Sequence, residues 1–399
     1  MKKFLKPFLC AILVFLSGLS LWAMDFGLLL DQDAGFGGLG TDTQFDYTGI
    51  LIPRFSALIG ETGDFTLSAG FRADYQGEAW ALFPELLRTE LTLRFGSGEL
   101  KAGRMQYSDP LGFIAEGLFD GARYSHDTGI GSFSVGAWYT GLLYKNRINI
   151  TMTGAELESS YVALDYGDFV NTYFAPRRLL SALGWEHPGL GDLVRADAAL
   201  LGQFDLSGKE ELHSQYLALK FTLPYRDFVF DLGGSFELTE LKEELGIAMA
   251  GELGAAWAPP LSFDSQLAFL GRFSSGVVED GSVVAFLPVT TSSQGEILKA
   301  KLSGLSMLSL EYTARIFRSF SAGLSSSYFI RSDLGTYTAG YGADGYFLGN
   351  EFYGRLIWSP LSDIMMKAGG GVFLPSLGNA APDADPLWRV ELNVIISLF

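Results

Sequence analysis

The sequence predicts an all-β fold: a transmembrane, antiparallel, up-and-down β-barrel of about 18 strands, in a range of roughly 16–20, with both termini periplasmic. Three observations support this class. Apolar and polar residues alternate with a period of two along many segments of the chain. The connections between these segments are short and long in turn. After residue 23, no uninterrupted apolar stretch is long enough for a membrane-spanning helix, which needs about 18 or more residues.

The composition of the 399-residue chain excludes several other classes. Hydrophobic residues make up 48% and aromatic residues 14%, which is too apolar for a disordered chain. Cys10 is the only cysteine, so neither a disulfide framework nor a thiolate metal site is expected. The 45 acidic residues outnumber the 28 basic ones, and this excess of negative charge argues against a nucleic-acid partner.

The first 23 residues have the pattern of a secretory signal peptide. Lys2, Lys3 and Lys6 precede an apolar stretch over 8–21, and Ala23 supplies a small residue at the expected cleavage site. We therefore expect a signal peptide over 1–23 and a barrel domain over 24–399. Without the three lysines, the mature chain keeps 25 basic residues against 45 acidic ones, a net charge of −20.

The strands follow from the alternation. In segment 65–75, Leu67 and Phe71 share one face, while Ser68 and Arg72 share the other. Strands of about 10–15 residues exceed the five or six residues usual in soluble sheets and are long enough to cross a bilayer. The first strand is expected near 26–32, and the clearest later ones at 65–75, 87–95, 194–204, 228–238, 245–257 and 388–398.

The connections set the strand number and orientation. Eight short turns are expected at 60–63, 96–98, 127–130, 187–192, 224–227, 258–261, 318–319 and 359–363. Nine longer connections are expected at 34–43, 77–85, 108–118, 145–172, 207–212, 239–244, 275–304, 332–346 and 375–386. Together they join about 18 strands, an even number, with short turns in the periplasm and long loops outside. Segments 145–172 and 275–304 are each long enough to hold a further hairpin, and whether 145–172 folds into the lumen stays open.

The polar face of the expected strands carries many charges. Burying them in a dry core would be very costly, whereas a wide barrel encloses water. We therefore expect a charged pore lining; the alternative is a set of ion pairs that only hold the wall together. The expected lining residues are Arg72, Asp74, Arg88, Glu90, Arg94, Lys101, Arg195, Asp197, Lys220, Asp231, Glu252, Asp264, Arg272, Arg315, Arg355, Lys367, Arg389 and Glu391, and the same facing applies to Glu237, Glu311 and Glu351.

Motifs for other chemistry are weak. Residues 35–40 fit the G-x-G-x-x-G pattern, but a strand rather than a helix follows them, which indicates an external loop and no dinucleotide site. The three histidines stand apart from any visible triad, so no enzyme is expected. Loop acids such as Asp31, Asp33, Asp383 and Asp385 are interpreted as solvated rather than as calcium ligands. The sequence therefore predicts no cofactor and no metal.

Two segments resemble known families. The C-terminal segment 394–399 is similar to the assembly signal of outer-membrane barrels, with Ser397 where that signal prefers an aromatic or apolar residue. The resemblance implies recognition by the barrel assembly machinery through a last strand that ends at Phe399. Segments 101–107 and 118–124, which contain Gly103-Arg104 and Phe119-Asp120-Gly121, resemble the early strands of alginate-export-type porins of eighteen strands. This second resemblance implies the barrel class only.

These observations lead to one expected function and two alternatives. The first is a porin-like channel in the outer membrane of a diderm bacterium, which lets small hydrophilic solutes diffuse passively through a charged, water-filled lumen. Its expected partners are outer-membrane lipid and the solutes. The alternatives are a structural or adhesive surface barrel with an occluded lumen, and a fatty-acid-type transporter of hydrophobic compounds.

Overall fold

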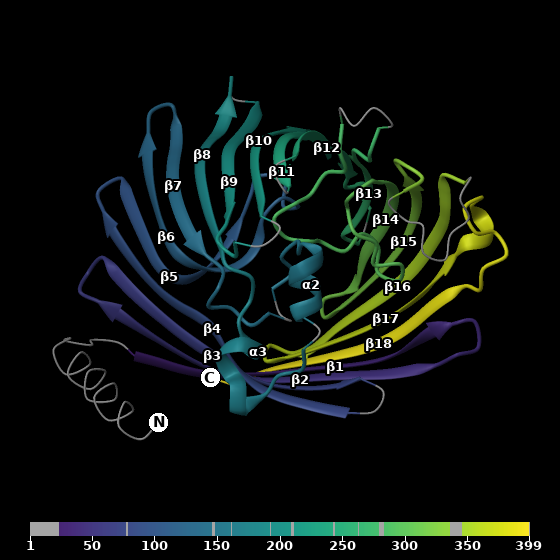
Figure 1. The fold of residues 1–399 in the computed structure, drawn as a ribbon, viewed down its shortest axis with the longest axis horizontal. Coiled ribbons are helices and arrows are strands. Elements are labelled where there is room, and N and C mark those ends of the chain that lie inside the picture. The colour runs from purple at the N-terminus through teal and green to yellow at the C-terminus, as the bar shows by residue number, and fades with distance from the viewer. Residues whose placement is uncertain are drawn as a thin grey trace.

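The computed structural model describes residues 24–398, apart from 77–78, 146–147, 161, 192, 209–210, 242–243, 262, 279–282 and 336–344. The expected signal peptide over 1–23 and the terminal Phe399 lie outside the described residues. Within them, 18 antiparallel strands form one sheet (Figure 1). Each strand pairs with the next in sequence, and β18 pairs with β1, which closes the barrel. The predicted 18-stranded barrel is confirmed.

The first nine strands are β1 (Met24–Leu39), β2 (Gln44–Ile59), β3 (Gly63–Gln76), β4 (Ala79–Phe95), β5 (Gly98–Ser108), β6 (Glu116–Thr128), β7 (Gly131–Tyr139), β8 (Arg178–Leu190) and β9 (Val194–Asp205). The second nine are β10 (Leu212–Tyr225), β11 (Phe228–Leu241), β12 (Glu244–Trp257), β13 (Ser265–Ser274), β14 (Leu305–Phe317), β15 (Phe320–Arg331), β16 (Phe347–Leu361), β17 (Ile364–Leu374) and β18 (Leu387–Leu398). The helices described are α2 (Gly154–Ser160), α3 (Phe169–Tyr173) and the 3-10 turns Tyr166–Asp168 and Pro375–Leu377.

All eight predicted short turns fall at short connections between consecutive strands. Gly60 and Gly96 supply the positive φ that two of these turns require, each at 61°. Two of the predicted long connections, 275–304 and 375–386, match the observed gaps between strands. The turn residues in the sequence therefore predict the positions of all eight short connections between strands.

Three predicted long connections are mostly strand instead. In the predicted connection 34–43, strand β1 continues to Leu39, and in 77–85, strand β4 begins at Ala79. In 239–244, β11 continues to Leu241 and β12 begins at Glu244. The expected external loop at 35–40 is thus wrong, and no helix follows the G-x-G-x-x-G pattern. Gly35 has a different role, because a Cβ there would lie 2.5 Å from the guanidinium of Arg389. The missing side chain of Gly35 leaves the space that the guanidinium of Arg389 occupies on this face of the sheet.

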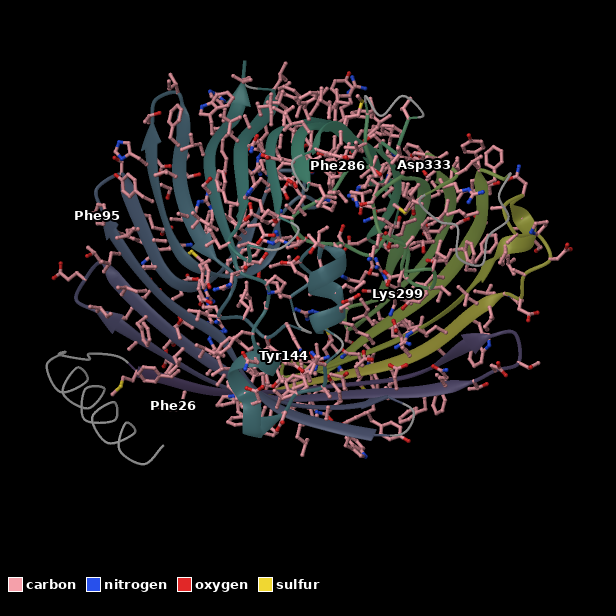
Figure 2. All side chains as sticks on the ribbon, in the orientation of Figure 1. Phe26, Phe95, Tyr144, Phe286, Lys299 and Asp333 are labelled. Atoms are coloured by element: carbon pink, nitrogen blue, oxygen red, sulfur yellow. The ribbon has the colours of Figure 1, made fainter. Side chains whose placement is uncertain are left out.

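The two faces of the sheet differ in polarity. On β3, Leu67 and Phe71 are exposed on the outside, while Thr66 and Ser68 are buried on the inside. Aromatic residues such as Phe26 and Phe95, both exposed, lie at the outer edge of the barrel in Figure 2. Among the described residues, no helix is long and apolar enough to cross a membrane. An apolar outer face of this kind is the face that lipid covers.

The hydrophobic core lies between the wall and loops that fold inside it. Three inward loops are defined by their described residues: the first inward loop (109–115), the second (140–145, 148–160 and 162–177) and the third (275–278 and 283–304). In the main buried cluster, Phe113 of the first loop and Phe286 of the third pack with Trp138 and Tyr216 of the wall. The open question about 145–172 is answered for its helix α2, which Figure 1 shows within the ring of strands.

Candidate functional site

The three inward loops meet each other across the lumen. The first loop connects β5 and β6 and the third connects β13 and β14, so they start from nearly opposite walls of the ring. The amide of Thr290 donates to the carbonyl of Ile114 at 3.0 Å, and the amide of Thr151 donates to the carbonyl of Val289 at 3.0 Å. Thr290 also accepts a hydrogen bond from the amide of Glu116 at 2.8 Å. The loops therefore narrow the passage from several sides.

Carboxylates of the wall hold the third inward loop in place. Glu351 on β16 accepts hydrogen bonds from three consecutive amides, those of Glu296 at 2.7 Å, Ile297 at 2.9 Å and Leu298 at 2.9 Å. Glu237 on β11 accepts from the amide of Leu287 at 2.9 Å. Both carboxylates are buried. A buried carboxylate that bonds several amides fixes a loop strongly, because hydrogen bonds to charged groups are the stronger ones.

A single aspartate organises the first inward loop. Asp109 accepts hydrogen bonds from the amides of Leu111, Gly112, Ile114 and Ala115, at 2.8–3.1 Å. Burial raises the pKa of Asp109, and the four amides oppose that shift in part. The loop is thus wound around its own carboxyl group.

The second inward loop is attached to the wall by buried charge. Arg178, at the start of β8, is fully buried and forms ion pairs with Asp205 of β9 and Glu156 of α2. Burial raises the pKa of the Glu156 carboxyl despite the arginine beside it. On the other side, the hydroxyl of Tyr173 donates to the carbonyl of Pro84 at 3.1 Å, and burial raises the pKa of this hydroxyl to about 12. The loop is therefore fixed to β4 as well as to β8 and β9.

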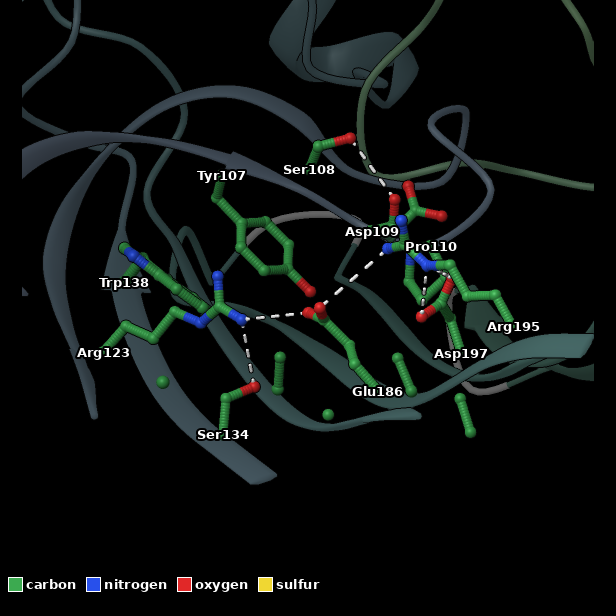
Figure 3. Close-up of a pocket in the computed structure, with 15 residues that line it drawn as sticks. Tyr107, Ser108, Asp109, Pro110, Arg123, Ser134, Trp138, Glu186, Arg195 and Asp197 are labelled. Atoms are coloured by element: carbon green, nitrogen blue, oxygen red, sulfur yellow. Dashed lines mark hydrogen bonds and ion pairs between the residues drawn. The ribbon is translucent and has the colours of Figure 1, made fainter. Parts of the chain in front are cut away.

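Cavities among the described residues lie beside these loops, and two of them are on the inner wall of charged strands. The first has a volume of about 180 Å³ and lies against β5–β9 and the start of the first inward loop (Figure 3). In it, Glu186 lies between two arginines, 3.5 Å from Arg123 and 4.0 Å from Arg195. Arg195 also pairs with Asp197 at 3.0 Å. These side chains are half-exposed, with the exception of buried Asp197, so they offer charge and hydrogen-bonding groups to the lumen.

The second cavity has a volume of about 240 Å³ and lies against β14–β16, beneath the third inward loop. The Arg355–Glu311 ion pair forms part of its wall. Glu296 and Lys299 of the loop contribute one charge of each sign. Lys299 has a positive φ of 49°, an uncommon conformation for a residue other than glycine. Figure 2 shows Lys299 within the outline of the barrel, well away from its outer edge.

Solved structures of other proteins resemble this chain over nearly its whole length. OccK2 (OpdF) of Pseudomonas aeruginosa, solved in complex with glucuronate, has a TM-score of 0.61 at 12% identity, over 95% of this chain and 98% of that one. The outer membrane protein OprD of the same organism has a TM-score of 0.59 at 14% identity, over 95% of each chain. OccAB1 of Acinetobacter baumannii has a TM-score of 0.60 at 10% identity, over 95% and 98%.

The chain has the fold of these proteins. At such low identity the likeness extends to the fold and no further. No family model matches the sequence, and no curated protein matches it.

Most of the residues predicted to line the pore lie on inward positions of the wall and are paired. The ion pairs are Arg72–Asp74 at 2.7 Å, Arg88–Glu90 at 2.9 Å, Arg94–Asp64 at 2.7 Å, Lys101–Glu99 at 3.4 Å, Arg195–Asp197 at 3.0 Å, Lys220–Glu252 and Arg272–Glu252 both at 2.9 Å, Arg389–Asp46 and Arg389–Glu391 both at 2.8 Å, and Arg355–Glu311. Asp231 accepts a hydrogen bond from Thr222 at 2.5 Å.

Three of the predicted lining residues, Asp264, Arg315 and Lys367, are placed differently. Asp264 lies in the β12–β13 turn and pairs at 3.1 Å with Arg315, and both side chains are exposed at the rim. Its predicted place in a strand is therefore wrong, because β13 begins one residue later, at Ser265. Lys367 of β17 is exposed and forms no ion pair with any residue that the structure describes.

Several important residues were missing from the sequence-based set. Arg104, which is buried, pairs with Asp120 at 2.6 Å and also donates to the carbonyls of Leu86 and Leu142. Arg178 was missed too. Leu179 and Leu183 have the opposite parity and are exposed on the outer face, so their alternation with Arg178 is the signal that could have predicted its inward side chain. Within the described residues, no group of three His, Cys, Asp or Glu side chains could hold a metal ion.

Proposed function

We propose that the protein is an outer-membrane channel for the passive diffusion of small hydrophilic solutes. The observation that carries this proposal is a closed 18-stranded barrel with an apolar outer face and an inner face of paired charges and cavities. Charged groups inside a barrel are stable when water fills the lumen. The inward loops narrow that lumen, so the solutes are small.

The pairing of opposite charges favours polar organic solutes over simple ions. Most arginines of the inner wall have a carboxylate within 4 Å, so the lining presents local dipoles rather than a field of one sign. The likeness to OccK2, solved with glucuronate, supports a small polar organic solute here as well. The eighteen predicted lining residues are proposed to form this surface, with Asp264 and Arg315 at its periplasmic rim.

An occluded surface barrel is the second candidate. The inward loops favour it, because their contacts form a continuous buried cluster with the wall. A fatty-acid-type transporter has less support, because the paired charges of the inner face suit hydrophilic solutes better than hydrophobic compounds. Conduction by the purified protein separates the first two candidates.

Further parts of the proposal concern targeting and family. Residues 1–23 are proposed as a signal peptide, the outer membrane of a diderm bacterium as the destination, and the strand ending at Phe399 as the contact with the barrel assembly machinery. The finer resemblance of segments 101–107 and 118–124 to alginate-export-type porins gains no support from the solved structures, which are OccK and OprD proteins. No enzymatic activity is proposed; among the described residues, none of the histidines bonds both a hydroxyl and a carboxylate.

Solute uptake by proteoliposomes tests the proposal. Vesicles that contain the refolded protein should swell in isotonic solutions of small sugars and amino acids, at rates that fall steeply with solute size. Vesicles with heat-denatured protein are the control. Swelling no faster than in this control, from vesicles with correctly folded barrel, would favour the occluded candidate.

A further inference from the structure

The cavity against β14–β16 is lined by an unusual number of hydroxyl groups. Four serines face it: Ser309 of β14, Ser325 and Ser327 of β15, and Ser293 of the third inward loop. Small residues make this space, because Gly323 of the wall and Gly295 of the loop also line the cavity. A Cβ at Gly295 would lie 2.7 Å from the carboxylate of Glu351, so glycine is needed where the loop approaches the wall.

The charges around the cavity are already engaged or balanced. Glu351 is occupied by three loop amides, and the hydroxyl of Tyr353 donates to Glu391 at 2.8 Å. Arg355 and Glu311 neutralise each other. The two charges that remain, on Glu296 and Lys299, are opposite in sign. An ionic solute therefore finds no unbalanced group of opposite charge on this wall.

The hydroxyl groups, in contrast, have bonding capacity left. Ser309 and Ser327 share one hydrogen bond at 2.9 Å. The hydroxyls of Ser293 and Ser325 have no partner among the residues that the structure describes. Each hydroxyl offers one donor and two acceptor sites, which is also what each hydroxyl of a polyol offers. The adjacent Arg355–Glu311 pair adds donors and acceptors side by side.

We propose that this cavity is a binding subsite for an uncharged, polyhydroxylated solute of hexose or hexitol size. The inference rests on the proposed channel function, since the subsite lies on the wall of the lumen. A volume of about 240 Å³ is below the range of drug-sized sites, roughly 300–1,000 Å³, and suits a single sugar-sized molecule. A zwitterion held between Glu296 and Lys299 is the competing occupant.

Sorbitol is the probe, and single-channel current in a planar bilayer is the measurement. Sorbitol at millimolar concentration should interrupt the current in a saturable way in the wild-type protein. Ser325→Val should weaken this block roughly three- to tenfold, because it removes one hydrogen-bonding group. Ser326→Val is the matched control: Ser326 is the next residue of β15, points to the other face and bonds Asn350. It should leave the block unchanged.

The outcomes separate the subsite from the channel. A conducting protein whose current is unaffected by sorbitol, or is blocked equally in the wild type and Ser325→Val, would overturn the subsite and leave the channel intact. If the free amino acid glycine blocks the current, Glu296→Gln abolishes this block and sorbitol has no effect, the cavity would be assigned to a zwitterion instead. A folded protein that never conducts would overturn the proposed function itself.

Discussion

At the scale of single residues, two arginine side chains join the wall to the second inward loop. Arg104 bonds one carboxylate and two carbonyls from three different parts of the chain: Asp120, Leu86 and Leu142. Arg178 joins β8, β9 and α2 through Asp205 and Glu156. The planar guanidinium suits this role, because it presents five donors in fixed directions. These two residues are structural anchors, distinct from the half-exposed charges of the lining.

The Arg104→Met substitution should destabilise the barrel by about 3–5 kcal/mol, because it leaves the carboxylate of Asp120 without its partner. Urea unfolding in lipid vesicles, followed by tryptophan fluorescence, measures the change. Arg315→Met is the control, since the exposed Arg315–Asp264 pair should contribute less than about 1 kcal/mol. Equal losses in the two variants would contradict the anchoring role of Arg104.

Two arginine substitutions on neighbouring strands test which side chains face the lipid and which face the lumen. Leu310→Arg on β14 should impair refolding, because Leu310 is exposed on the outer face and a charge near the bilayer midplane costs about 2–4 kcal/mol. Ser325→Arg on β15 should be tolerated, because Ser325 faces the cavity opposite Glu311. Refolding yield in vesicles is the readout. Similar yields for both arginine variants would reject this register.

At the scale of the elements, the strands could be predicted from sequence and the paths of the loops could not. Period-two alternation separated Leu67 from Ser68, and turn residues such as Gly60 and Gly96 marked the tight connections. The glycines at 35–40 led to a wrong prediction of an external loop, because a strand rich in glycine has the composition of a loop. The inward paths depend on contacts such as Glu116 with Thr290, which are 174 residues apart in the chain. No local pattern contains that information.

The third inward loop should move when its anchor is removed. Glu351→Ala deletes the acceptor of three loop amides, which should weaken the inward position of the loop by about 2 kcal/mol or more. Single-channel conductance should rise, and larger neutral polymers should enter the pore. In Asn350→Ala, the neighbouring residue that bonds Ser326 on the other face, both quantities should stay at wild-type values. Unchanged conductance in Glu351→Ala would show that this carboxylate does not hold the constriction.

At the scale of the whole molecule, the excess negative charge of the chain and the paired charges of the pore lining lie in different places. The expected mature charge of −20 is not reflected in the lining, where arginines and carboxylates are paired. The field of the excess acid is screened beyond about 8 Å at physiological salt. We therefore expect a weak preference for cations that fades as salt rises, measured as the reversal potential in a salt gradient. Strong anion selectivity at low salt would mean that the lining arginines control permeation.

Single-channel recording of the refolded, purified protein in a planar lipid bilayer shows whether the lumen conducts ions. A barrel with a water-filled lumen between its inward loops should give stable, uniform steps of current whose size grows with salt concentration. The absence of any conductance steps, from protein shown by its resistance to unfolding to have inserted as a closed barrel, would contradict the channel function and indicate that the loops seal the lumen.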